Sequence, residues 1–214
     1  MSEQPVYFKQ LQLGPMLNFV YLVGDPASRE AAIVDPGWDI PAIVRQLKTD
    51  GYKPTKIFLT HTHPDHWMGM DQLLSVVDLP VHVHTEEAGE LPIEPGNIRK
   101  VDGGEIISVG SIPVSLIHTP GHTPGSQCLL VNGKLISGDT LFIKGCGRCD
   151  LPGGDAATLY DSLTKLRALD DSTILCPGHN YADVPSIALG EEKQANPFLK
   201  MPNLEAFLRL VGQA

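Results

Sequence analysis

Three histidines and one aspartate fall within six positions of the stretch TKIFLTHTHPDHWMGM, residues 55–70. They are His61, His63, Asp65 and His66. Because Asp65 and His66 are adjacent, the four groups fit neither one face of a helix nor one face of a strand. Imidazole and carboxylate groups are zinc and iron ligands, normally four or more to a metal. Since neighbouring side chains diverge, the spacing predicts two metals, with His61 and His63 on one and Asp65 and His66 on the other.

Three further residues are candidates for the rest of such a site. His122 stands in HTPGHTPGS, where glycine and proline on both sides let the backbone turn sharply beside a metal. Asp139 in SGDTLF follows an apolar stretch; a two-metal site needs a bridging carboxylate, which favours a ligand over a capping group. His179 in CPGHNY repeats the Pro-Gly-His pattern of His122. The other histidines are expected to be ordinary core or surface residues: His82, His84 and His118.

The candidate ligands follow stretches that resemble strands. KIFLT leads into His61, VSLIHTPG into His122, KLISGD into Asp139 and ILCPG into His179. Loops at strand ends hold side chains on a rigid scaffold and leave them accessible. The apolar patterns predict strands at 6–13, 18–24, 31–37, 56–60, 81–84, 105–109, 112–119, 126–131, 134–139 and 172–178. They predict helices at 39–51, 71–78, 155–170, 185–195 and 203–211, with Asp39 as an N-cap and Gly51 as a stop.

Composition fits one soluble domain over residues 1–214, with a short helical C-terminal tail (about 185–214). The net charge of −9 argues against nucleic acid or an anionic membrane as the main partner. There is no apolar run long enough to span a membrane and no signal-peptide pattern, so a cytoplasmic location is expected. The cysteines are too sparse for a disulfide framework, and the C-x-x-C at 146–149 is expected to be structural or incidental.

The motifs THTHPDH, TPGHT, GDTLF and PGHNY, in that order, resemble the metallo-β-lactamase superfamily over nearly the whole chain. The resemblance implies an α/β fold, a four-layer αβ/βα sandwich with two mixed sheets and a dinuclear site at one edge between them. It implies two divalent ions, with zinc preferred and iron or manganese as alternatives. It also implies a ligand set in which the first metal binds His61, His63 and His122, the second binds Asp65, His66 and His179, and Asp139 bridges.

Within the superfamily, the chain is most similar to the glyoxalase II-like (hydroxyacylglutathione hydrolase-like) group and its sister group, the persulfide dioxygenases. The similar segments are LGPMLNFVYLV, AAIVDPGWD, LFIKGCGRCDLPGGDAATLYDSL and GEEKQANPFL. Secreted class B β-lactamases usually lack the bridging aspartate and carry a signal peptide, and flavodiiron proteins place a glutamate where His63 stands. The resemblance therefore implies a thiolesterase acting on glutathione-type or related acyl thioesters.

The same resemblance implies contacts to the thiol carrier from three residues: Arg148 in GCGR, Tyr181 two positions after His179, and Lys200 in NPFLK. The match then weakens. Cys149 and Asp150 replace an expected aromatic segment, and Asn203 replaces a second basic residue. The resemblance also does not extend to the long helical domain of full-length glyoxalase II, which residues 1–214 are expected to lack. The thioester chemistry therefore carries over better than the glutathione specificity.

The implied mechanism is attack by a metal-bridging hydroxide. Two divalent metals, two carboxylates and a hydroxide leave a net positive charge, which favours an anionic tetrahedral intermediate. The thiolate can leave without an obligatory acid, because thiols have a pKa of about 8.5. Of the two catalytic carboxylates, Asp139 would bridge, and Asp65 would be mainly a ligand.

Other interpretations stay open. Persulfide dioxygenases use one iron held by two histidines and an aspartate, here His61 or His63, His122 and Asp139. The presence of all seven ligands favours hydrolysis. A binding or regulatory protein without turnover would require an occluded site. Trp67 is expected to pack under the metal loop, the alternative being a place at the substrate mouth.

Overall fold

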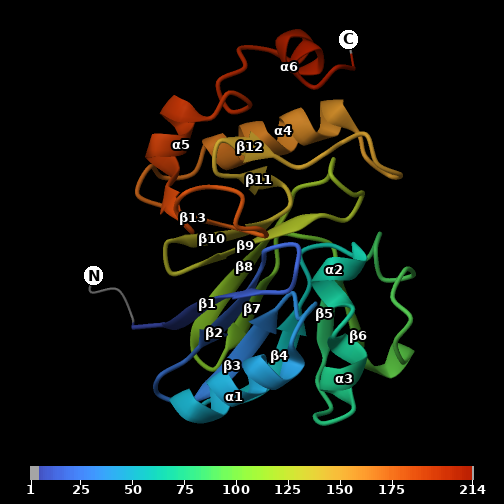
Figure 1. Cartoon of the computed structure of the whole chain (residues 1–214), viewed down its shortest axis with the longest axis vertical. Coiled ribbons are helices and arrows are strands. Elements are labelled where there is room, and N and C mark those ends of the chain that lie inside the picture. The colour runs from blue at the N-terminus through green and yellow to red at the C-terminus, as the bar shows by residue number, and fades with distance from the viewer. Residues whose placement is uncertain (1–4, 214) are drawn as a thin grey trace.

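Two six-stranded sheets form the centre of the computed structural model, which describes residues 5–213 (Figure 1). The first sheet has the order β1-β2-β3-β4-β5-β6. Its strands are β1 (Tyr7–Leu13), β2 (Asn18–Gly24), β3 (Glu30–Val34), β4 (Lys53–Phe58), β5 (Val81–His84) and β6 (Ile98–Val101). Pairs from β1 to β3 are antiparallel and pairs from β3 to β6 are parallel, so the sheet is mixed.

The second sheet has the order β14-β13-β10-β9-β8-β7. Its strands are β7 (Ile106–Val109), β8 (Ile112–His118), β9 (Gln127–Val131), β10 (Lys134–Gly138), β13 (Ile174–Pro177) and β14 (Ile187–Ala188). β10 and β13 are parallel and the other pairs are antiparallel. A small hairpin of β11 (Leu141–Phe142) and β12 (Gly145–Cys146) lies beside this sheet.

Helices cover the outer face of each sheet (Figure 1). α1 (Ile40–Asp50), α2 (Pro64–Trp67) and α3 (Met70–Leu74) belong to the first half, and α4 (Ala156–Arg167), α5 (Leu189–Ala195) and α6 (Leu204–Leu210) to the second. The predicted ends of α1 are confirmed. The Asp39 carboxylate accepts from the Ala42 N–H, and Gly51 ends the helix with a φ of 75°.

Side-chain alternation explains the layers, because successive residues of a strand point to opposite faces. In β2, Val20 and Leu22 pack in the core beneath α1 and α3, whereas Phe19 and Tyr21 pack between the two sheets. β10 repeats the arrangement, with Ile136 facing the first sheet and Leu135 facing α4. The layers run helices, sheet, sheet, helices. The predicted α/β four-layer sandwich with two mixed sheets is confirmed.

The short elements were missed from the sequence. β6 has the sequence IRKV with two exposed basic residues at a sheet edge, so it lacks the alternation of a half-buried strand. β11, β12 and β14 each contain two residues, too few for any periodicity. The helix predicted over 71–78 is shorter than expected, and the one predicted over 185–195 begins only at Leu189 because β14 precedes it.

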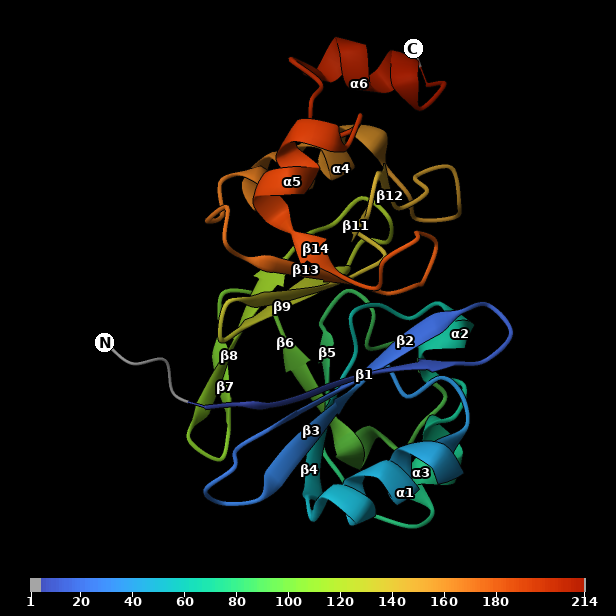
Figure 2. The ribbon, with the colours of Figure 1, turned by 60° about the vertical axis from the view of Figure 1, so that its left-hand side comes forward.

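The two sheets are joined where the loops after β4, β8, β10 and β13 meet (Figure 2). Backbone hydrogen bonds cross between the halves there, from Gln127 N–H to the Thr60 carbonyl at 2.8 Å and from Phe19 N–H to the Gly178 carbonyl at 2.8 Å. This edge is therefore a fixed frame for the loop side chains. Among residues 5–213, none of the helices combines the length and the apolarity needed to cross a membrane.

Candidate metal centre

All seven predicted ligands converge at this edge. His63 Nδ1 lies 3.1 Å from His61 Nε2 and 2.9 Å from His122 Nε2. Nε2 atoms of His66 and His179 lie 3.2 Å apart. Three overlapping sets have their ligand atoms within 4.8 Å of one another: His61, His63 and His122; His61, His66 and Asp139; and Asp65, His66 and His179.

Asp139 lies between these sets. Its Oδ1 is 3.3 Å from His66 Nε2, and its Oδ2 is 3.4 Å from His179 Nε2 and 3.7 Å from His122 Nε2. The carboxylate thus faces histidines from both predicted metal positions. Asp65 lies on one side only, with its Oδ2 at 3.3 Å from His179 Nε2 and 3.5 Å from His66 Nε2.

In three histidine rings, Nδ1 lies within hydrogen-bond distance of an acceptor outside the ligand set. His66 Nδ1 is 2.9 Å from Asp35 Oδ2, His122 Nδ1 is 2.7 Å from the Arg148 carbonyl, and His179 Nδ1 is 2.9 Å from the Met16 carbonyl. Each acceptor assigns the proton of a neutral imidazole to Nδ1. The Nε2 lone pair of each ring is then directed into the cluster, as in metal-binding histidines.

This arrangement fits a divalent metal. With both Nδ1 atoms protonated, His66 and His179 turn two Nε2 lone pairs toward each other at 3.2 Å. Asp139 Oδ1 is buried and has no hydrogen-bond partner among the described residues. Facing lone pairs and an anionic buried oxygen repel one another unless cations lie between them, protons in the metal-free cluster or metal ions in the loaded one. The donor set of imidazoles and carboxylates is that of zinc or iron.

The charges in the cluster are strongly coupled. Burial opposes protonation of His66, but Asp139 and Asp35 outweigh it and raise the pKa of that imidazole well above its usual value. Burial likewise opposes protonation of His179, yet hydrogen bonds to Asp139 and Asp65 raise its pKa to about 9. Burial lowers the pKa of His61, which is fully enclosed. Positive charge is therefore stabilised on the side of the cluster near the two carboxylates.

The carboxylates show the complementary shift. Burial would raise the pKa of Asp65, but His179, His66 and Asn18 lower it to about 2. His66 and His179 hold the pKa of Asp139 well below its usual value, although burial opposes them. Both groups are thus anionic, as metal ligands must be.

Sequence reasoning missed Asp35, which orients two parts of the site. Its carboxylate accepts from the Thr60 N–H at 2.8 Å and the Thr60 hydroxyl at 2.6 Å, and it also holds His66. Asp35 has a φ of 55°, a left-handed conformation that side chains rarely adopt. The sequence feature that could have identified Asp35 is the segment IVDPG, in which a carboxylate directly follows a buried strand.

Asn18 and Glu87 were missed as well. Asn18 Nδ2 donates to Asp65 Oδ2 at 2.7 Å and fixes that carboxylate. Glu87 accepts from the Thr62 N–H at 2.6 Å and the Gly125 N–H at 3.0 Å, so it ties together the loops that carry His63 and His122. No sequence spacing linked either residue to the metal motifs, because both contacts are long-range.

Two predicted substrate residues border a cavity of about 380 Å³ beside the cluster. The ring of Tyr181 stacks on His179 with centroids 4.7 Å apart. Arg148 is exposed, and its Nε and Nη2 donate to the two carboxylate oxygens of Asp150 at 2.9 and 2.8 Å. The cavity gives access to the cluster, because His63, Asp139 and His179 also line it.

Lys200 does not lie with them. It is exposed and lines neither this cavity nor its neighbour around Arg148 and Tyr181. The preceding residue, Leu199, accepts a hydrogen bond through its carbonyl from Arg167 on α4. Asn203 caps α6 by accepting from the Ala206 N–H at 2.9 Å. Asn203 therefore has a structural role, and Lys200 is an exposed residue that borders neither cavity.

From the sequence, Trp67 was expected either to pack under the metal loop or to lie at the substrate mouth, and the structure shows packing together with a place beside a cavity. Its indole Nε1 donates to the Thr62 carbonyl at 2.9 Å, and its ring packs against the core of the first half. It also lines a cavity of about 510 Å³ together with His63 and Glu90. Trp67 therefore supports the metal loop and borders open space next to His63.

The remaining histidines and cysteines lie outside the cluster. His84 and His118 stack on each other with ring centroids 3.9 Å apart, and His82 lies against Phe58. All four cysteines are free. Burial raises the pKa of Cys146 to about 12, so this thiol is protonated and unreactive at neutral pH.

The family model of the metallo-β-lactamase superfamily matches residues 13–179. The chain belongs to the metallo-β-lactamase superfamily. At this level it is a metal-dependent hydrolase of that superfamily.

Three relatives illustrate the range of chemistry within reach of this fold. The chain is 28% identical over 193 residues to a probable polyketide biosynthesis zinc-dependent hydrolase, PksB of Bacillus subtilis (strain 168), covering 90% of this chain and 86% of PksB. It is similar to the crystal structure of ETHE1 from Myxococcus xanthus, with 30% identity and a TM-score of 0.87, covering 96% and 90% of the two chains.

The third relative bears on metal number. The structure of TTHA1623 in a di-iron-bound form is 31% identical, has a TM-score of 0.79, and is covered completely by 89% of this chain. None of the three names belongs to the glyoxalase II-like group, so that finer prediction stays a prediction. Zinc and iron both occur among these names, and the metal of this chain is likewise a matter for proposal.

Proposed function

We propose that this protein hydrolyses acyl thioesters at a centre of two divalent metal ions, with zinc as the favoured metal and a small glutathione-type thiol as the leaving group. The observation that carries the proposal is the construction of the second ligand set. Asp65, His66 and His179 are supported as firmly as the first set, by Asn18 and Asp35 and by the Met16 carbonyl.

A mononuclear site would not require that support. Two histidines and Asp139 suffice for one iron. Asp65 and His179 would then be fixed in position without binding a metal. Without a second ion, Asp65 and His179 would pair only with neighbouring ligands, and a buried ion pair adds little net stability. Because both ligand sets are held by hydrogen-bonding partners, the structure favours two ions over one.

The residues that would hold the ions follow from the three sets of converging donors. The first ion would take His61, His63 and His122, the second Asp65, His66 and His179, and Asp139 would serve both. When bound, two divalent ions supply a nucleophile at neutral pH and polarise the thioester carbonyl.

The chain itself positions the substrate. Tyr181 and Arg148 border the cavity next to the cluster, and this is where the thiol carrier would lie. The flat face of Tyr181 over His179 restricts the carrier to one side of the second ligand set. No proton donor is needed at the sulfur, because a thiol of pKa about 8.5 leaves readily as the thiolate.

Metal content and two activities test the proposal on one preparation. Protein purified without added metal is analysed for metal, and S-lactoylglutathione hydrolysis and O₂ uptake with glutathione persulfide are measured in parallel. Two metals per chain with thioester turnover is the expected result. His179→Ala should abolish hydrolysis, whereas the control His118→Ala should retain it, since His118 lies outside the cluster. One iron per chain with O₂ consumption and no hydrolysis would contradict the proposal.

A mononuclear-iron persulfide dioxygenase is the second candidate. The observations that favour it are the GCGR segment, which resembles that of persulfide dioxygenases, and the similarity to the structure of ETHE1 over 96% of this chain. It predicts that His179→Ala, which removes a ligand only of the second ion, would leave O₂ uptake largely intact. The same variant therefore separates the two candidates.

A further inference from the structure

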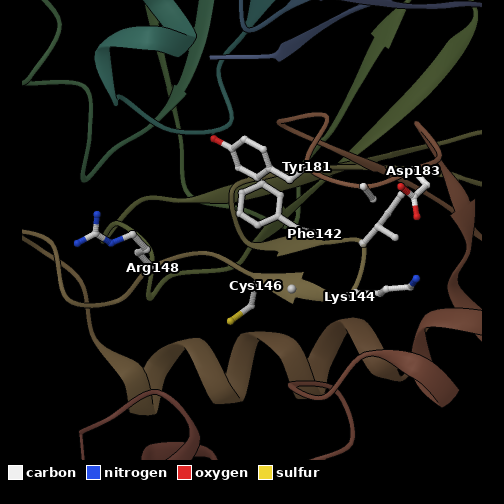
Figure 3. A pocket seen from close by; sticks show the side chains of 9 residues that line it. Phe142, Lys144, Cys146, Arg148, Tyr181 and Asp183 are labelled. Carbon is white, nitrogen blue, oxygen red and sulfur yellow. The ribbon is translucent and has the colours of Figure 1, made fainter. Parts of the chain in front are cut away.

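A cavity of about 500 Å³, whose lining Figure 3 shows, adjoins the cavity beside the metal cluster; we call it the second cavity. The two share Phe142, Arg148 and Tyr181 in their walls. Phe142 and Tyr181 meet edge to face with their centroids 5.4 Å apart. A substrate that reaches the cluster past these rings would extend its distal end into this second cavity.

Opposite charges stand unpaired at the far end of this cavity. Figure 3 shows Lys144 and Asp183 at the end away from Arg148. Neither the Lys144 ammonium nor the Asp183 carboxylate has an ion pair or a side-chain hydrogen bond among residues 5–213. Arg148 differs, because its Nε and Nη2 already donate to the Asp150 carboxylate. The unpaired charges at the end of the cavity away from Arg148 are therefore one cation and one anion.

The backbone at Lys144 is fixed in an unusual conformation. Lys144 lies in the tight turn between β11 and β12 with a φ of 59°, a left-handed value that glycine adopts more easily. Its N–H donates to Glu192 Oε2 at 2.7 Å, and Glu192 is fully buried in α5. A lysine at a position where glycine would relieve strain indicates a use for its side chain.

We propose that Lys144 and Asp183 bind the zwitterionic α-amino acid end of the thiol carrier, Lys144 its carboxylate and Asp183 its ammonium. The inference rests on the proposed function and names the carrier class, a small thiol such as glutathione with both charges at its distal end. A phosphate-bearing carrier such as coenzyme A would meet Lys144 but would be repelled by Asp183. The charge pair is therefore a selectivity device.

Binding calorimetry with two thioethers tests the role of each charge without turnover. The probes are S-propylglutathione and its analogue lacking the α-amino group of the γ-glutamyl residue. We expect wild type to bind S-propylglutathione about fivefold more tightly than the analogue, as for a partly exposed charge pair. Asp183→Asn should abolish this preference, and Lys144→Met should weaken both probes about fivefold, because both retain the carboxylate.

Control variants separate charge from folding. Lys100→Met and Asp161→Asn remove exposed charges that have no side-chain partner elsewhere in the described chain, and they should leave both affinities unchanged. Lys144→Gly relieves the left-handed backbone, so its thermal midpoint should equal or exceed that of wild type while its affinity for S-propylglutathione falls. If Lys144 had only a structural role, Lys144→Gly would keep its affinity for S-propylglutathione as well as its thermal midpoint.

Equal binding of the two probes by wild type, or a preference that survives Asp183→Asn, would overturn the inference. Tighter binding of S-propyl coenzyme A than of S-propylglutathione would also overturn it. A failure of the proposed function can be distinguished from a failure of this inference. If no thioester is hydrolysed but the charge-dependent preference is measured, the carrier assignment stands and thioester hydrolysis does not. If thioesters are hydrolysed without that preference, only the carrier assignment is lost.

Discussion

At the scale of single residues, the metal centre depends on groups that never touch the substrate. Asp35 contacts His66 and Thr60 at once, so one carboxylate sets the ring orientation of a ligand and the course of the loop that begins the ligand run. Such partners of metal-binding histidines typically change metal affinity 10- to 100-fold.

Asp35→Asn should weaken binding of the second metal about 10- to 100-fold. The amide presents an N–H₂ group toward His66 or Thr60, where the carboxylate now accepts from both. Asparagine tolerates the left-handed backbone as aspartate does, so the change tests charge rather than strain. Metal retained during titration with a competing chelator measures the effect. Asp102→Asn, which changes an exposed carboxylate, should retain wild-type affinity, and equal retention by Asp35→Asn would refute the role.

Trp67 offers a second test at this scale. Trp67→Phe keeps an aromatic ring but loses the hydrogen bond to the Thr62 carbonyl, and should lower the free energy of unfolding by about 1 kcal/mol. Trp67→Ala also removes packing and should cost about 3 kcal/mol. Urea unfolding measures both. If Trp67→Ala leaves stability unchanged but alters acyl-chain selectivity, the residue acts on the substrate and not on the loop.

The sequence was most informative for the ligands and least for their supports. His61, His63 and Asp65 lie within one short motif. This motif identifies a metal site because zinc and iron bind particular donor atoms. Asp35 and Asn18 reach the same site from 31 and 47 positions away from their partners. A single sequence carries no record of such long-range contacts, so these residues could only be found in the folded chain.

At the scale of elements, turns between strands connect the two sheets. Asp25 follows β2 and accepts through Oδ2 from the N–H of Ser111 at 2.8 Å and from its hydroxyl at 2.9 Å, in the turn between β7 and β8. Its Oδ1 accepts from the Ala27 N–H at 2.8 Å. One carboxylate therefore shapes its own turn and ties it to the other sheet.

This contact predicts a pH dependence of stability. Hydrogen bonds from Ser111 and Ala27 lower the pKa of Asp25 to about 2, below its value of about 3.9 in an unfolded chain. Its contribution is then complete above about pH 4 and is lost as pH falls through about 2. In metal-free protein, Asp25→Asn should be less stable than wild type at pH 5, and the difference should shrink as pH approaches 2. Urea midpoints measure it; Asp161→Asn is the control, and a constant difference would contradict the assignment.

Regular elements were predictable and irregular ones were not. α1 was bounded correctly by Asp39 and Gly51, because caps are local chemistry. The β11–β12 hairpin, which carries Phe142 and Lys144 into the second cavity, has strands of two residues each. Its conformation is set by contacts with α5, including the one from Lys144 N–H to Glu192, and not by a local preference.

At the scale of the whole molecule, the ligand cluster joins the two halves. His61, His63, Asp65 and His66 follow the first sheet's β4, whereas His122, Asp139 and His179 follow strands of the second sheet. Each of the three donor sets contains residues of both halves. A bound ion is consequently a cross-link between the sheets as well as a cofactor.

Metal removal should therefore lower the stability of the whole chain and not only its activity. A ligand present at a thousand times its Kd stabilises a fold by about 4 kcal/mol, which for a chain of this size corresponds to a Tm shift of about 10 °C. Calorimetry with and without chelator measures the shift. His118→Ala should show all of it, because His118 lies outside the cluster, and His179→Ala should show less, because one ion loses a ligand from the second half. If chelation removes the metal and leaves the Tm unchanged, the sheets are held by their own contacts, and the ions act in chemistry alone.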